Sequence, residues 1–251
     1  MPVRARLRAP SLEIALTLPA PTTPSLVGTL IVVALAAGTS MGVRSSSAAP
    51  RRRFEIALAA ANIVLLVASK AIEARQGFDT FAWLPLQVCD VSSAACALAL
   101  LRGGSLWRAT TLYFGVGLST FALLFPDLSA GPASIAFWVF WLRHGAIMLT
   151  GLYDVIARNY RPSWSDYGRW CAFGAGYVTV VSLVNASLHT NFAFIANHTL
   201  QSSAILESFG TWPTRSVVML GLALLHAAAI TLLVQSLPAA RPFDRVSQTR
   251  G

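Results

Sequence analysis

Two pairs of adjacent polar residues lie inside apolar stretches of this chain, and their side chains could carry out chemistry together. They are Cys89-Asp90 and Arg143-His144. A thiol becomes a nucleophile when an imidazole accepts its proton, and a guanidinium can stabilise an oxyanion or bind a phosphate. The pattern suits acyl transfer, with Cys89 as candidate nucleophile and His144 as candidate base. Asp90 could orient the imidazole or neutralise Arg143, since either charge alone inside a membrane is costly.

Three polar residues near the end of a later apolar stretch extend this candidate site: Asn185, His189 and Asn191. At a helical rise of 1.5 Å per residue, Cys89 and Asp90 lie about 12 to 14 Å inside their stretch, and Arg143 and His144 lie slightly deeper. All of these residues fall between the midplane and the outer face of a bilayer. We therefore expect Asp90, Arg143, Asn185, His189 and Asn191 to bind substrate beside Cys89, with His144 or His189 assisting the thiol. The competing interpretation makes Arg143 part of a structural ion pair and His144 a packing residue.

The composition places the chain among membrane proteins. Hydrophobic residues make up 55% of its 251 residues, charged residues make up 12%, and the mean hydropathy is +0.60. The net charge of +9 comes mostly from residues in short connectors and tails, a pattern of membrane topology rather than of nucleic-acid binding. The three cysteines, Cys89, Cys96 and Cys171, show neither a disulfide framework nor zinc-ligand spacing. We expect no metal and no cofactor.

Seven apolar stretches predict an all-α polytopic membrane protein with seven transmembrane helices in one bundle. About 20 apolar residues cross the hydrocarbon core of a bilayer. The predicted spans are Ser25–Gly42, Phe54–Glu73, Phe81–Leu101, Trp107–Phe125, 133–160, Trp170–Leu188 and Arg215–Gln235. They form one domain, 25–236, between a mobile tail at 1–24 and a cytoplasmic tail at 237–251. Lys70 and Glu73, three residues apart, should pair near the membrane edge.

Basic residues predict how the spans are oriented in the cell membrane. Most of them fall in the connectors after the first, third and fifth spans and in the C-terminal tail, whereas the other connectors hold only Arg75 and Arg215. By the positive-inside rule the C-terminus is cytoplasmic and the N-terminus lies outside. Small residues such as Gly115, Gly117, Gly174 and Gly176 should allow close helix approach within the bundle.

The motifs at these positions resemble a known family. The matching motifs are LPLQVCDVSS at 84–93, FPDL at 125–128, RHGAIMLTGLYD at 143–154, YRP at 160–162, LVNASLHTNFAFI at 183–195 and FGTWP at 209–213. Together they resemble the YwaF-type integral membrane family, which also takes in animal transmembrane protein 164, over residues 50–238. The resemblance implies seven membrane helices. The animal branch is described as a phospholipid acyltransferase with a cysteine and a histidine, which would fall on Cys89 and His144. Family members commonly have His where this chain has Gln87, so a role for that imidazole does not carry over.

Three functions follow from these observations. The first is a membrane acyltransferase, whose substrate is a membrane lipid or its acyl chain. The alternative is a membrane carrier or small-ligand binding protein that uses the Arg143 and Asp90 pair as its intramembrane site. The third is a structural or sensory subunit. No oligomeric state follows from the sequence.

Overall fold

The computed structural model describes residues 21–76, 81, 83–126, 128, 131–196, 206 and 208–238. Most of the two predicted tails lies outside these residues. Every regular element in the described part is helical. The elements are α1 (Thr23–Arg44), α2 (Ala48–Gln76), α3 (Val88–Leu101), α4 (Ser105–Thr110), the π-helix η1 (Thr111–Leu118), α5 (Ser119–Leu124), α6 (Ile135–Ile156), α7 (Trp164–Leu188), the 3₁₀-helix η2 (Phe192–Phe194) and α9 (Thr214–Ser236).

Five of these helices are long and apolar enough to cross a membrane: α1, α2, α6, α7 and α9. The elements α4, η1 and α5 follow one another directly from Ser105 to Leu124 and correspond to the predicted fourth span. The apolar helix α3 is shorter, at 14 residues. The described chain thus has seven helical segments in the predicted order.

The third segment differs from the prediction, because its helix begins at Val88 and not at Phe81. Pro85 has no N–H to donate and disfavours helical conformation in the residue before it. Asp90 then fixes the start, because its Oδ2 accepts the backbone N–H of Gln87 at 2.9 Å, which is one half of a capping box. Cys89 and Asp90 therefore lie in the first turn of α3 rather than two turns inside a helix.

The sixth segment begins earlier than predicted, at Trp164 instead of Trp170. Ser163 and Asp166 form a capping box at this end, in which Asp166 accepts the Ser163 N–H at 2.9 Å and Ser163 accepts the Asp166 N–H at 3.1 Å. The cap gives hydrogen-bond partners to backbone N–H groups at the start of the helix, so the helix extends through residues 164–169.

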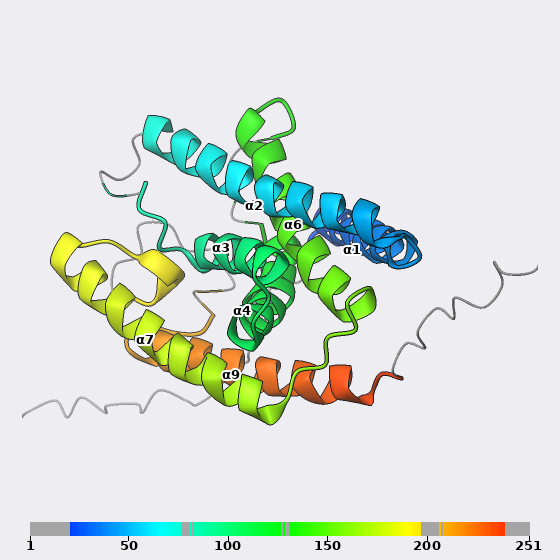
Figure 1. Cartoon of the computed structure of the whole chain (residues 1–251). Helices are drawn as coiled ribbons and strands as arrows, with labels where there is room; N and C mark the ends of the chain where they lie inside the picture. Colours follow the sequence, from blue (N-terminus) through cyan, green and yellow to red (C-terminus); the bar gives the residue numbers. More distant parts are fainter. Residues whose placement is uncertain are drawn as a thin grey trace, which may run out of the picture.

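The short helix α3 lies in the middle of the bundle (Figure 1). It contacts α2 and α6 as well as α4 and η1. Helix α6 in turn packs against α1, α2 and η1, while α7 and α9 lie side by side across the molecule from α2. Because α2, α3 and α6 touch one another, polar side chains on these three helices can meet inside the bundle.

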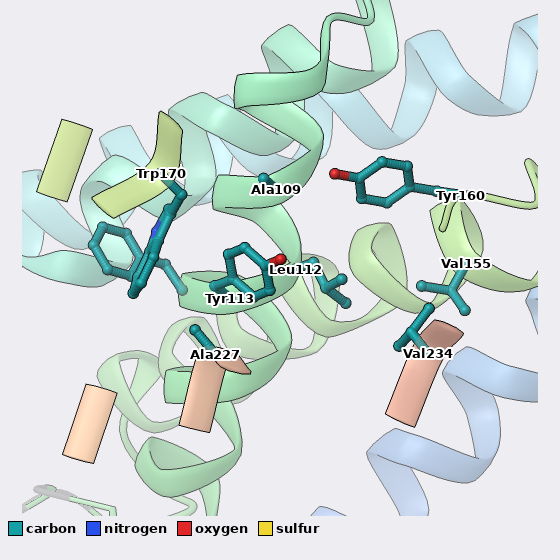
Figure 2. Packing of buried hydrophobic residues seen from close by; sticks show 9 residues of the cluster. Ala109, Leu112, Tyr113, Val155, Tyr160, Trp170, Ala227 and Val234 are labelled. Carbon is teal, nitrogen blue, oxygen red and sulfur yellow. The ribbon is translucent and has the colours of Figure 1, made fainter. Parts of the chain in front are cut away.

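An aromatic core joins the fourth segment to α7 and α9 (Figure 2). Tyr113 of η1 packs edge-on against Trp170 of α7, with ring centroids 5.1 Å apart. The Tyr113 hydroxyl and the hydroxyl of Thr231 on α9 form a hydrogen bond of 2.7 Å. Buried aromatic rings contribute large apolar areas and specific edge contacts, so this core fixes the fourth segment against α7 and α9.

Glycines bring the π-helix η1 and α6 into close contact. A Cβ placed on Gly115 would lie 3.0 Å from Cγ2 of Ile147, and one on Gly151 would clash with Val116. The expected close approach at Gly117 is also present, against His226 of α9. The prediction was wrong for Gly174 and Gly176, since no described atom lies within 4 Å of a Cβ there.

Candidate functional site

The carboxylate of Asp90 and the guanidinium of Arg143 form an ion pair between α3 and α6. The side chain of Asp90 is 0% exposed and that of Arg143 is 4% exposed. Both charges are therefore enclosed by protein, as an intramembrane pair requires. This contact confirms the expected partnership of the two residues.

Residues of α2 complete the surroundings of this pair. Lys70 Nζ lies 3.1 Å from Asp90 Oδ2, and Arg143 donates from Nη1 to Ser69 Oγ at 2.8 Å. Lys70 also binds Glu73 at 2.5 Å, as predicted. We call Lys70, Glu73, Asp90 and Arg143 the charge cluster. From the sequence we expected Lys70 at the membrane edge and did not connect it with Asp90. Both residues are charged and lie in apolar stretches, so each needs a counter-charge, and this need could have linked them.

Cys89 lies beside this charge cluster. It is a half-buried free thiol in the first turn of α3, and it directly precedes Asp90 in the sequence. The first-turn N–H groups of a helix have no intrahelical acceptor, so they can bind a partial negative charge. The Cys89 thiol therefore lies at the N-terminus of a helix, next to a carboxylate that two cations neutralise.

His144 follows Arg143 on α6 and is buried. Its Nδ1 lies 2.9 Å from the carbonyl oxygen of Phe140, which can only accept, so Nδ1 carries the proton. The imidazole also packs on the Phe140 ring, with centroids 4.3 Å apart. These contacts fix the tautomer that keeps the Nε2 lone pair, which is the form a general base needs.

The polar residues at the end of α7 organise a loop rather than the charge cluster. Asn185 Oδ1 accepts the Phe192 N–H at 2.8 Å and the Thr190 hydroxyl at 2.9 Å, while Asn191 Oδ1 accepts the Ala196 N–H at 3.0 Å. His189 is exposed and ends α7 with a left-handed backbone.

This loop touches the start of α3 through Gln87. The Ala193 N–H donates to Gln87 Oε1 at 3.0 Å, and the Gln87 N–H donates to Asp90. Tyr177 of α7 adds a second contact, because its hydroxyl donates to the Leu86 carbonyl at 2.7 Å. Asn185 and Asn191 thus reach the candidate site through the backbone around Gln87, not through their own side chains.

A second set of charges lies at the other end of α6. Asp154 is 2.7 Å from Arg108 and 3.3 Å from Arg158, and Glu55 accepts the Tyr153 hydroxyl at 3.0 Å. At helical rise this set is about 16 Å along α6 from Arg143. The two charged sets tie the helices together at two separate levels.

No group of three His, Cys, Asp or Glu side chains in the described part of the chain could hold a metal ion. The described residues instead offer the thiol of Cys89, the neutralised carboxylate of Asp90 beside it in the sequence, and the buried imidazole of His144 on the neighbouring helix α6. These are the groups of covalent catalysis by a cysteine.

Comparison with known proteins gives one family. Neither a curated protein nor a solved structure matches the chain. The profile of the TMEM164 family matches residues 17–233, a range that includes the charge cluster, Cys89 and His144. The protein is therefore a membrane protein that belongs to the TMEM164 family.

Proposed function

We propose that this protein is a membrane enzyme that transfers acyl groups between lipids, with Cys89 as nucleophile and His144 as base. The observation that carries the proposal is the pairing of Asp90 with both Arg143 and Lys70. A carboxylate next to a thiol disfavours the thiolate, but two cations offset the charge of this one. The two cations thus remove one of the costs of forming a thiolate beside a helix N-terminus.

The proposed reaction has two halves that balance in protons. In the first half His144 Nε2 takes the proton of Cys89, the sulfur attacks the ester carbonyl of a membrane lipid, and the departing lipid oxygen takes the proton from His144. In the second half His144 takes the proton of an acceptor hydroxyl, whose oxygen attacks the thioester. The Cys89 thiolate leaves and regains the proton from His144.

The remaining site residues act as supports in this proposal. Arg143 directs its nitrogens to Asp90, Ser69 and Ser93, so the oxyanion is better stabilised by backbone N–H groups at the start of α3. The N–H groups of Asp90 and Val91 already donate to the Gln87 carbonyl, which leaves this role to those of Val88 and Cys89. Asn185 and Asn191 hold the loop that bears on Gln87. His189, exposed at the end of α7, is the other histidine that was expected to assist the thiol, and the proposal assigns this role to His144.

The test uses purified protein in vesicles that contain a phospholipid with an alkyne-tagged acyl chain. Wild-type protein should release lysophospholipid and carry a hydroxylamine-sensitive alkyne label on Cys89. Cys89→Ala should lose both signals, and His144→Gln should lower the transfer rate by about 100- to 10,000-fold. Cys171→Ala, another half-buried thiol, is the matched control and should keep both. Undiminished acyl transfer by a folded Cys89→Ala variant would refute the proposal.

The carrier function finds less support in the same geometry. A carrier site must bind and release its ligand, whereas the Asp90 and Arg143 side chains are enclosed and already paired. Transport that depended on Arg143 and not on Cys89 would reverse this preference.

We also propose that the protein lies in the cell membrane with its N-terminus outside and its C-terminus in the cytoplasm. In support, arginines meet the ends of neighbouring helices on one side of the bundle: Arg51 donates to the Ala157 carbonyl and Arg158 to the Ala99 carbonyl. Green fluorescent protein fused to the C-terminus should fluoresce, while alkaline phosphatase there should be inactive. Fusions at residue 128, between α5 and α6, should give the opposite pair of results. The reverse outcome at both positions would invert the orientation.

A further inference from the structure

An apolar groove opens on the outer surface of α2, beside the segment that leads into α3. It has a volume of about 410 Å³, within the roughly 300 to 1,000 Å³ typical of small-molecule sites. Figure 1 shows this segment running next to the C-terminal end of α2. The apolar lining consists of Leu66, Val67, Ala71, Ala74, Trp83 and Pro85.

The groove faces the surroundings of the bundle rather than its interior. Val67 and Trp83 are 61% and 54% exposed, and Ala71 and Ala74 are exposed as well. In a membrane protein such a surface lies against lipid, and Trp is enriched at the level of the headgroups. A lipid chain can therefore enter the groove sideways from the bilayer without crossing water.

Lys70 is the charged residue of the groove lining, and it links the groove to the charge cluster. Its ammonium lies 3.1 Å from Asp90 and 2.5 Å from Glu73. Asp90 is fully enclosed, whereas the Glu73 side chain is 38% exposed. Glu73 can therefore turn away, which leaves the Lys70 ammonium to bind another anion at the groove.

We propose that this groove binds one acyl chain of a membrane phospholipid, with the lipid phosphate bound by Lys70 in place of Glu73. An acyl chain matches the apolar lining, and a phosphate matches Lys70, the cation among the described lining residues. The inference rests on the proposed function in one respect, since a phospholipid held in this groove would be the acyl donor for Cys89. Glu73 acts in this site as a competitor that the phosphate must displace.

The test is photo-crosslinking of the full-length protein in vesicles that contain phosphatidylcholine with a diazirine in one acyl chain. Mass spectrometry should locate the label on residues 66–74 and 83–85. Ala71→Trp fills the groove from its exposed side and should lower labelling at least about tenfold. Ala186→Trp, a matched exposed alanine on α7, should leave labelling of the groove unchanged.

Two further variants test the role of the headgroup. Lys70→Gln should lower phospholipid labelling about tenfold, the loss expected of one charge-assisted hydrogen bond, and Glu73→Gln should raise it. A diacylglycerol with the same diazirine chain, which has no phosphate, should label the groove less than the phospholipid does. Equal labelling by the two probes, or an unchanged Lys70→Gln variant, would overturn the assignment of the phosphate to Lys70.

The same labelling in a Cys89→Ala background separates this inference from the catalytic one. Binding needs no thiol, so groove labelling should persist in that variant. Persistent labelling without acyl transfer in the wild type would leave the groove in place and refute the enzyme. Acyl transfer without groove labelling in wild-type protein would refute the groove and leave the enzyme.

Discussion

The carboxylate of Asp90 on α3 and the guanidinium of Arg143 on α6 pair in the middle of the bundle, and both also bind α2. Lys70 contacts the second carboxylate oxygen, while Ser69 accepts a hydrogen bond from Arg143. Three helices are thereby joined at one level. The same contacts neutralise the carboxylate that adjoins Cys89, so the ion pair has a structural and a chemical consequence.

Removing the Asp90 charge should destabilise the protein strongly. Asp90→Asn leaves the Arg143 guanidinium buried without its counter-charge, and breaking such a pair costs about 3 to 5 kcal/mol. Unfolding of the purified protein in detergent, followed by circular dichroism, measures the loss. Glu73→Gln, at the half-exposed end of the cluster, is the control and should change the free energy of unfolding by less than about 1 kcal/mol.

The double variant Asp90→Leu with Arg143→Met sharpens this prediction. It removes both charges together and replaces them with apolar groups, so it should be more stable than Asp90→Asn. If the double variant were less stable than Asp90→Asn, the attraction between the two charges would exceed the free-energy cost of burying them.

A second polar contact between α2 and α6 should show weak energetic coupling. Asn62 donates to Thr150 Oγ1 at 3.0 Å, and both side chains are buried. A double-mutant cycle with Asn62→Leu and Thr150→Val should give a coupling energy of about 0.6 kcal/mol, the average for such bonds in membrane bundles. A coupling near zero would mean that the two groups bond equally well elsewhere once separated.

Glycine substitutions should distinguish tight from open helix surfaces. Gly151→Ala forces a methyl group against Val116 and toward the Thr111 carbonyl of η1, 3.4 Å away. Overpacking of this kind costs about 1 to 3 kcal/mol. Gly176→Ala is the control, because no described atom lies within 4 Å of its Cβ position. Thermal unfolding should give a lower midpoint for Gly151→Ala and an equal or higher one for Gly176→Ala.

Tyr160, in the connection between α6 and α7, should make stability depend on alkaline pH. Burial raises the pKa of its hydroxyl well above the usual value. An unfolded chain loses the phenol proton near pH 10 while the folded protein keeps it, so stability falls as pH rises, by up to about 1.4 kcal/mol per pH unit. Tyr160→Phe should show a shallower decline above that pH.

At neutral pH the Tyr160→Phe variant should lose no stability. The buried hydroxyl has no hydrogen-bond partner among the described residues, and Arg108 can still stack on the ring, where it now lies 4.2 Å from the centroid. Parallel unfolding curves of the two proteins from pH 7 to 11 would contradict the assignment of the pH dependence to Tyr160.

Hydropathy predicted the number and order of the helical segments because each segment is predominantly apolar, including α3, which at 14 residues is shorter than the five helices that could cross a membrane. It failed at the start of α3, where the apolar residues 81–86 continue the pattern although Pro85 and the Asp90 cap begin the helix at Val88. Hydropathy indicates whether a segment lies in an apolar environment, whereas backbone hydrogen bonds determine the residue at which a helix starts.

The sequence by itself determined that this is an all-helical membrane protein and that Asp90 needed a buried cation, since apolar length and uncompensated charge are local properties. Only the tertiary structure decided which side chains meet. It brought Lys70 and Ser69 to the pair and turned Asn185 and Asn191 toward their own loop. The physical reason is helix rotation: residues at equal depth can face one another or lie on opposite sides, and contacts with neighbouring helices alone select between them.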